Sequence, residues 1–256
     1  MEHIYIYTFI GFLGGITAGM LGLGGGIIFV PGLMIVHKYY GLFASYELQV
    51  AVYTSLISII FAGSTSSILH YKNGLIDMNI VQKYSLYVCF GSFFGIYILE
   101  HVSSASLELV YSIILIFLAL LLLSDARVIK NNIRYFNKAG NLYFFANGSI
   151  SSLMGIGGGT LSVPYLSFLI NDIKKSIASA SAIGLIIAIS SLLYMFLLNS
   201  SIFSEKINNI ALLILIPSSI LGSYTGVYLL KVLNPGKVKN IFSSLLIVVA
   251  IYLLLD

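Results

Sequence analysis

Hydrophobic residues gather along the chain in eight long blocks that short polar segments separate. Six of the blocks hold about 18 to 24 residues, the length of one helical membrane crossing at about 1.5 Å per residue. They cover residues 48–70, 80–99, 106–124, 176–198, 207–230 and 238–255. The other two blocks, 4–36 and 140–170, are longer, and glycines interrupt each of them near its middle. A block of that kind predicts a helix, a non-helical tip and a second helix.

The composition indicates that these blocks lie in a membrane. Of the residues, 59% are hydrophobic and 9% are charged, whereas a soluble domain carries roughly 25% charged residues. A water-soluble fold could not cover that much apolar surface with polar side chains. The net charge of +4 comes from Lys and Arg between the apolar blocks, with no basic stripe of the kind that binds nucleic acid. We therefore predict an all-α, polytopic membrane protein that does not bind nucleic acid.

Two pairs of similar stretches indicate that one helical unit occurs twice. Residues 19–31 read GMLGLGGGIIFVP, and residues 152–164 read SLMGIGGGTLSVP. A second pair follows at nearly the same spacing, with GSFFGIYIL at residues 91–99 and GSYTGVYLL at residues 222–230. Each repeat is predicted to contain one glycine-tipped helical hairpin and three transmembrane helices.

The predicted repeats occupy residues 1–125 and 140–256, and a linker at 126–139 joins them. The linker is basic, with Arg127, Lys130, Arg134 and Lys138. Positive charge in short loops marks the cytoplasmic side of a membrane protein. If the second long block is a hairpin that enters and leaves on one face, 11 of the 13 Lys and Arg residues share a side and only Lys38 and Lys206 face the other. One crossing per block would leave no such bias.

The repeat predicts that the first long block is a hairpin as well. The second half is then inverted relative to the first, which is the plan of many secondary transporters with a substrate site near mid-membrane. The basic linker is predicted to be cytoplasmic, and the chain is predicted to cross the inner or plasma membrane several times.

The two hairpin tips share the sequence Gly-x-Gly-Gly-Gly, followed by a short apolar helix that contains a proline. Glycine permits positive φ angles and close approach of a ligand to the backbone. The start of the following helix offers unpaired N–H groups and the positive end of the helix dipole, which suit an anion without any charged side chain. The candidate substrate-binding glycines are Gly22, Gly24, Gly25, Gly26, Gly155, Gly157, Gly158 and Gly159. Pro31 and Pro164 are expected to shape the outgoing helices.

Close helix packing is the alternative reason for glycine in a membrane helix. It suits the pairs Gly91/Gly95 and Gly222/Gly226, which stand four residues apart within their blocks. Three consecutive glycines would destabilise a continuous helix by about 1 kcal/mol each, so a ligand role is favoured at the tips. No Gly-Lys-Ser/Thr follows them, which excludes a P-loop. The four histidines lack metal-ligand spacing, so neither a metal nor another cofactor is predicted.

Polar residues within the blocks are mostly hydroxyls. A hydroxyl can donate to an anion, but it can also bond to its own or a neighbouring helix. Thr54, Ser55 and Ser181 are candidates because they occupy similar positions, early in the helix after each hairpin. Asn147 in the second hairpin and Thr17 in the first are further candidates.

The glycine motifs, with Ala51-Val-Tyr-Thr-Ser55 and His70-Tyr-Lys-Asn-Gly74, resemble the sulfite exporter TauE/SafE family of permeases. The resemblance covers essentially the whole chain. It implies a transporter whose substrates are sulfur-containing anions such as sulfite, sulfonates or sulfoacetate. The second half departs from the pattern, because residues 178–182 read ASASA where a copy of the Thr-Ser motif is expected.

We therefore predict a secondary transporter for small anions that works by alternating access and is not an enzyme. The expected partners are the anion, the lipid bilayer and a coupling ion, H⁺ or Na⁺; Glu47 and His70, which flank the second block, are the candidates for carrying a proton. The alternatives are an anion channel lined by the same tips and a membrane receptor or assembly subunit.

Overall fold

The computed structural model describes residues 2–43, 46–101, 133–198 and 207–232, with single residues between 109 and 120 and at 247 and 251. Every regular element within these residues is a helix, which confirms the all-α prediction. The predicted blocks at 106–124 and 238–255 fall outside the described residues apart from those single positions.

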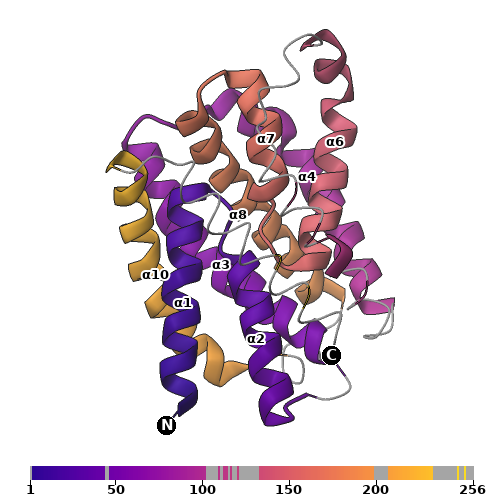
Figure 1. Cartoon of the computed structure of the whole chain (residues 1–256). Helices are drawn as coiled ribbons and strands as arrows, with labels where there is room; N and C mark the ends of the chain where they lie inside the picture. Colours follow the sequence, from indigo (N-terminus) through magenta and orange to yellow (C-terminus); the bar gives the residue numbers. More distant parts are fainter. Residues whose placement is uncertain are drawn as a thin grey trace.

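The helices follow the predicted blocks closely. Each half contains a broken pair of helices and then two long ones (Figure 1). The first half comprises α1 (Glu2–Leu21), α2 (Gly26–Tyr40), α3 (Glu47–Lys72) and α4 (Met78–His101). The second half comprises α6 (Ile133–Met154), α7 (Gly159–Ile170), α8 (Ile173–Leu198) and α10 (Asn209–Val232). Both long blocks therefore break at their glycines, as predicted, and α6 begins within the range predicted as linker.

The two broken pairs occupy different ends of the molecule. In Figure 1, α1 rises from the lower end and α2 returns towards it, whereas α6 descends from the upper end and α7 returns upwards. A left-handed residue ends each short helix: Gly41 follows α2 with φ 62°, and Asn171 follows α7 with φ 55°. Such a residue lets its N–H bond the last free carbonyls of a helix. Pro31 and Pro164 lie inside α2 and α7, where proline cannot donate the usual backbone hydrogen bond.

The helix contacts of one half have counterparts in the other. In the first half α2 packs on α3, and in the second α7 packs on α8. Between the halves, α1 and α3 pack on α10, while α6 and α8 pack on α4. The two long helices α3 and α8 cross each other between these groups. Each repeat therefore completes the packing of the other.

Glycine pairs allow the closest of these helix contacts. A Cβ atom added at Gly91 or Gly95 of α4 would collide with the backbone of α6. One added at Gly222 or Gly226 of α10 would collide with the backbone of α1. The prediction that these pairs serve close packing is confirmed.

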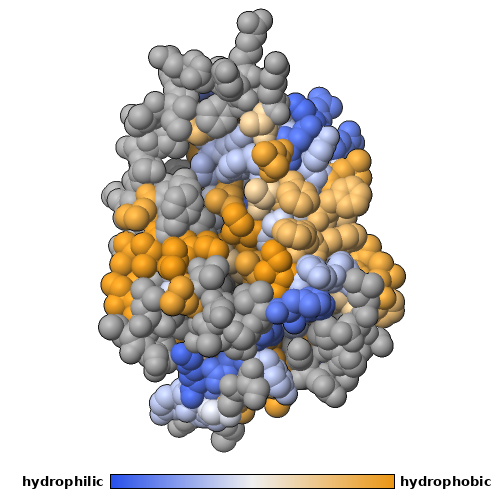
Figure 2. Space-filling model, turned by 90° about the vertical axis from the view of Figure 1, so that its right-hand side faces the viewer, coloured by the Kyte–Doolittle hydropathy of each residue, from blue (hydrophilic) through white to orange (hydrophobic). Residues whose placement is uncertain are grey.

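The outer surface is suited to lipid. Four described helices, α1, α3, α8 and α10, are long and apolar enough to cross a membrane by length and composition. On the face shown in Figure 2, hydrophobic residues form a band across the middle, with hydrophilic residues above and below it. Large apolar side chains such as Leu142 and Leu213 are more than 70% exposed, which favours contact with acyl chains rather than with water.

Candidate functional site

The two glycine tips lie at the centre of the structure. Gly22, Gly24 and Gly25 in the first tip have φ angles of 67° to 86°. The second tip has the same conformation, with φ angles of 63° to 70° at Gly155, Gly157 and Gly158. All the residues of both tips are buried. Because only glycine adopts such angles readily, the sequence imposes the two breaks.

The tips contact each other through their backbones. A Cβ atom at Gly24 would lie 3.1 Å from the Cα of Gly157, and one at Gly157 would lie 3.2 Å from the Cα of Gly24. A Cβ atom at Gly26 would collide with the carbonyl oxygen of Gly155, and one at Gly159 with that of Gly22. The glycines are therefore required by chain conformation and by contact between the halves. Close packing therefore explains several tip glycines for which the sequence analysis favoured a ligand role.

The start of each short helix is buried at this contact. Gly25 and Gly158 are the N-cap residues of α2 and α7, and no side chain caps either helix. The positive ends of two helix dipoles consequently point to the same region, between the halves. Backbone N–H groups at such ends can hold an anion without a basic side chain.

The predicted hydroxyls do not all meet at the tips. Ser55 of α3 does, because its hydroxyl donates to the carbonyl of Gly155 over 2.7 Å. Thr54 instead accepts a hydrogen bond from the backbone N–H of Asn208, at 3.1 Å. Ser181 of α8 bonds two hydroxyls of α3, those of Ser66 and Ser67, at 2.7 and 3.2 Å. Thr17 donates to the carbonyl of Gly14 in its own helix.

The second hairpin carries a buried polar group beside its tip. Asn147 donates to the hydroxyl of Ser162 over 2.7 Å and accepts from Ser151 over 2.9 Å. The Asn147 side-chain oxygen is 3.5 Å from where a Cβ atom at Gly158 would stand. Thr160, the second residue of α7, is 1% exposed, and its hydroxyl has no hydrogen-bond partner within the part of the chain that the structure describes. The structure therefore places the side chain of Asn147 beside the second tip.

Thr160 and Ser162 escaped prediction from the sequence. They belong to the stretch Gly-Gly-Gly-Thr-Leu-Ser, whose first-half counterpart reads Gly-Gly-Gly-Ile-Ile-Phe. The two hydroxyl residues that only the second stretch contains were the sequence signal that could have identified Thr160 and Ser162. In the first hairpin, the ring of Phe29 lies over Gly14, with no room there for a Cβ atom. Gly14 and Phe29 are the first-half counterparts of Asn147 and Ser162. The first half therefore has an apolar contact where the second half has a polar one.

Two histidines are completely buried. The Nε2 atom of His70 lies 3.0 Å from the carbonyl of Gly19, on the helix that leads to the first tip. Near it, the ammonium of Lys231 donates to the side chain of Asn73. His37 of α2 lies at the opposite end of the first half, beside Asn208. Across the described residues, no group of three His, Cys, Asp or Glu side chains is placed to hold a metal ion.

Comparison with known proteins identifies relatives along nearly the whole chain. The family model described as "Sulfite exporter TauE/SafE" matches residues 7–253. The chain is 30% identical over 270 residues to the probable membrane transporter protein YunE of Bacillus subtilis, covering 98% of this chain and 97% of that protein. A probable membrane transporter protein of Methanocaldococcus jannaschii is 26% identical, with 96% and 93% covered. One from Haemophilus influenzae is 29% identical, with 74% and 72% covered. No solved structure matches the chain.

The contact between the tips predicts opposite outcomes for two buried helical glycines. Gly26→Ala places a methyl group against the Gly155 carbonyl and should lower the free energy of unfolding by about 1–3 kcal/mol. Gly63→Ala is the matched control, because the nearest atom to its added methyl is 3.7 Å away. That change should be neutral or stabilising by up to about 1 kcal/mol. Thermal unfolding of the two detergent-solubilised variants measures the difference, and a Gly26→Ala protein as stable as the wild type would contradict the contact.

Proposed function

The chain belongs to the sulfite exporter TauE/SafE family of membrane transporters, and we propose that it is a secondary transporter of small anions such as sulfite and sulfonates. The family name supports this substrate class, and the names of the relatives support membrane transport. The observation that carries the proposal is the meeting of two buried helix N-termini, those of α2 and α7, at glycine tips between the halves. No catalytic step forms part of it.

The proposed binding site is the backbone of both tips. An anion between them would accept hydrogen bonds from N–H groups at the starts of α2 and α7, where the helix dipoles favour negative charge. A sulfonate or sulfite presents three oxygens to such donors and needs no lysine or arginine in the membrane interior. Since the tips touch, binding requires that they separate. The tip contact is, in this proposal, the closed state of the pathway.

Side chains beside the tips complete the proposed site. The hydroxyl of Ser55 now donates to the Gly155 carbonyl and can turn to an anion when the tips part. Asn147 adds an amide at the second tip, and Thr160 adds a buried hydroxyl that no protein group accepts. Thr54 and Ser181 are assigned a supporting role, because each bonds across helices away from the tips.

Alternating access of two inverted repeats is the proposed mechanism. Three observations support it: the hairpins run from opposite ends in Figure 1, each helix contact has a counterpart in the other half, and charge is asymmetric along the sequence. By the positive-inside rule, the basic linker at 126–139 faces the cytoplasm. The membrane in which the chain is proposed to reside is the cell membrane.

Flux measurements in proteoliposomes test the proposed function. Proteoliposomes that contain the wild-type protein should accumulate sulfite or at least one sulfonate of a test panel with saturable kinetics. Single-channel anion currents should be absent. Gly25→Leu and Gly158→Leu should each abolish this flux, because a side chain at either N-cap has no room and displaces the start of the short helix that forms the proposed site. Gly41→Leu is the control, since Gly41 has a φ of 62° and open space around it. Equal flux in all three variants, each confirmed as folded by size-exclusion chromatography, would exclude the tips from the site.

Cysteine labelling tests the inverted arrangement. In a Cys89→Ser background, Lys174→Cys at the start of α8 should react with impermeant maleimide only from the cytoplasmic side. Tyr39→Cys near the end of α2, at a position 80% exposed, should react only from outside. Tyr39 lies near the end of the first hairpin, and Lys174 lies just after the end of the second. Labelling of both from the same face would contradict inverted repeats.

A further inference from the structure

Asn208 joins four helices at the end of the molecule where α10 begins. Its side-chain oxygen accepts the backbone N–H of Ala211 at 3.0 Å and so caps α10. Its amide nitrogen donates to the hydroxyl of Tyr7 on α1 and contacts Nε2 of His37 on α2, both at 3.1 Å. Its backbone N–H donates to Thr54 on α3. Tyr7, His37, Thr54 and Asn208 are all at most 6% exposed.

This arrangement determines which nitrogen of His37 carries the proton. The helix cap uses the oxygen of Asn208, so the NH₂ group must be the part of the amide that faces His37. An NH₂ group only donates, and Nε2 must therefore accept with its lone pair. His37 is then neutral and protonated on Nδ1. The imidazole is completely buried, with the backbone of Glu47 beside it.

A second proton on His37 is incompatible with these contacts. Protonated Nε2 becomes a donor and would face the donor NH₂ of Asn208. If the amide turned to offer its oxygen, the N–H of Ala211 would lose its cap. If the imidazole moved away instead, the link between α2 and α10 would break. Either way, protonation loosens the junction between the start of α10 and the first hairpin.

Described residues of α1, α2 and α3 and of the turn after α2 surround His37. Tyr7 lies on α1, and Tyr40 is close enough to Tyr7 for electrostatic interaction. Lys38 follows His37 on α2, and the ring of Phe43, after α2, stands edge-on to the imidazole at 5.0 Å. Glu47, the first residue of α3, has its backbone beside the imidazole. Among the described residues named here, Glu47 and Lys38 are the formally charged ones, and each has interactions within the protein.

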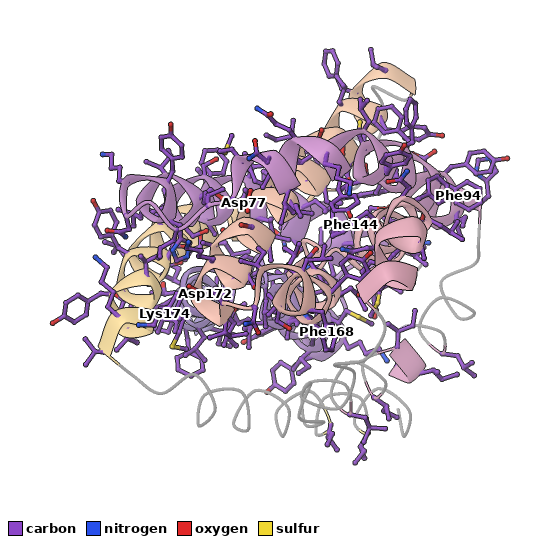
Figure 3. The ribbon with its side chains drawn as sticks, turned by 90° about the horizontal axis from the view of Figure 1, so that it is seen from above. Asp77, Phe94, Phe144, Phe168, Asp172 and Lys174 are labelled. Atoms are coloured by element: carbon purple, nitrogen blue, oxygen red, sulfur yellow. The ribbon has the colours of Figure 1, made fainter. Side chains whose placement is uncertain are left out.

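The junction at the start of α4 repeats the cap but not the histidine. Asp77 caps α4 by accepting the N–H of Ile80, and its backbone N–H donates to Ser179 of α8. Figure 3 shows Asp77 on the same side of the molecule as Asp172, which precedes α8. By the spacing of the glycine motifs, the position equivalent to His37 is Ile170. One end of the molecule therefore holds a histidine in the helix junction, and the equivalent position at the other end is an isoleucine.

We propose that His37 is the binding site of a coupling proton, whose arrival releases the start of α10 from α1, α2 and α3. The proposal rests on the proposed transport function, because the released junction is the one that would open this end of the substrate pathway. It differs from the sequence-based candidates Glu47 and His70. A proton bound at His37 makes the junction at the start of α10 respond to pH through a group that the equivalent position, Ile170, lacks.

A tryptophan reporter tests protonation without any substrate. The chain contains no tryptophan, so Phe43→Trp places the sole indole against the His37 ring, and a protonated imidazole quenches indole fluorescence. Fluorescence of this variant in nanodiscs should fall in a single transition between about pH 8 and pH 4. Adding His37→Gln should abolish the transition, because the glutamine oxygen accepts from Asn208 but takes up no proton in that range. An identical transition in the double variant, or none in Phe43→Trp alone, would overturn the proposal.

Asn208→Asp provides a second variant that keeps the cap. The aspartate retains an acceptor for Ala211 and presents its other oxygen to His37, which favours the protonated ring. In the Phe43→Trp background, it should move the fluorescence midpoint to higher pH by about one unit or more. An unchanged midpoint would contradict the assignment of the transition to His37.

Coupling itself is tested with methanesulfonate, whose charge is constant over this range. An imposed pH gradient should change the initial rate of methanesulfonate flux at least about tenfold, or about 1.4 kcal/mol, in wild-type proteoliposomes. His37→Gln should retain exchange at equal pH and lose the response to the gradient. A full response in His37→Gln would overturn the coupling role. If the wild type carries no sulfonate, the proposed substrate is wrong, and the fluorescence titration alone decides the proton site.

Discussion

The contact between two stretches of bare backbone is the constraint on which the rest of the structure depends. Gly26 and Gly159 begin the short helices, and each lies against a carbonyl of the opposite tip, where a methyl group has no room. This contact allows α2 and α7 to begin in the protein interior, with their dipoles directed at each other. Residues of α3 and α8 pack directly against the tips, which are buried. Irregular backbone is tolerated at membrane depth only inside protein or beside a water-filled cavity.

Much of the fold could be predicted from the sequence, because its signals are local. Apolar blocks of membrane length, breaks at Gly-Gly-Gly and glycines four residues apart each act through the conformation of one segment or the closeness of one helix pair. The partners of particular side chains could not be predicted in this way. Ser181 seemed a counterpart of Ser55, yet it bonds Ser66 on α3, whereas Ser55 reaches the second tip. Those pairings depend on how distant helices rotate against each other, which no single segment encodes.

The two halves share backbone contacts and differ in their side chains. Both tips have the same φ pattern, and both caps, at Asp77 and Asn208, donate their N–H to a hydroxyl of the opposite half. Beside the tips, however, the second hairpin buries Asn147 and Ser162 where the first buries Gly14 and Phe29. The two halves thus share a framework of backbone contacts, and the side chains that differ within it distinguish the two ends. Side chains that differ between the halves therefore show how the two ends differ in function. The glycines, which both halves require for backbone contact, do not show this difference.

A cryo-electron microscopy map of the protein in nanodiscs, recorded with a bound sulfonate, tests the central claim most directly. The account predicts that the tips around Gly24 and Gly157 have separated, with the sulfonate between the first turns of α2 and α7 and both helices still beginning at their glycines. Tips that remain in contact while the sulfonate occupies another position would contradict the account. So would a continuous helix through either glycine tip.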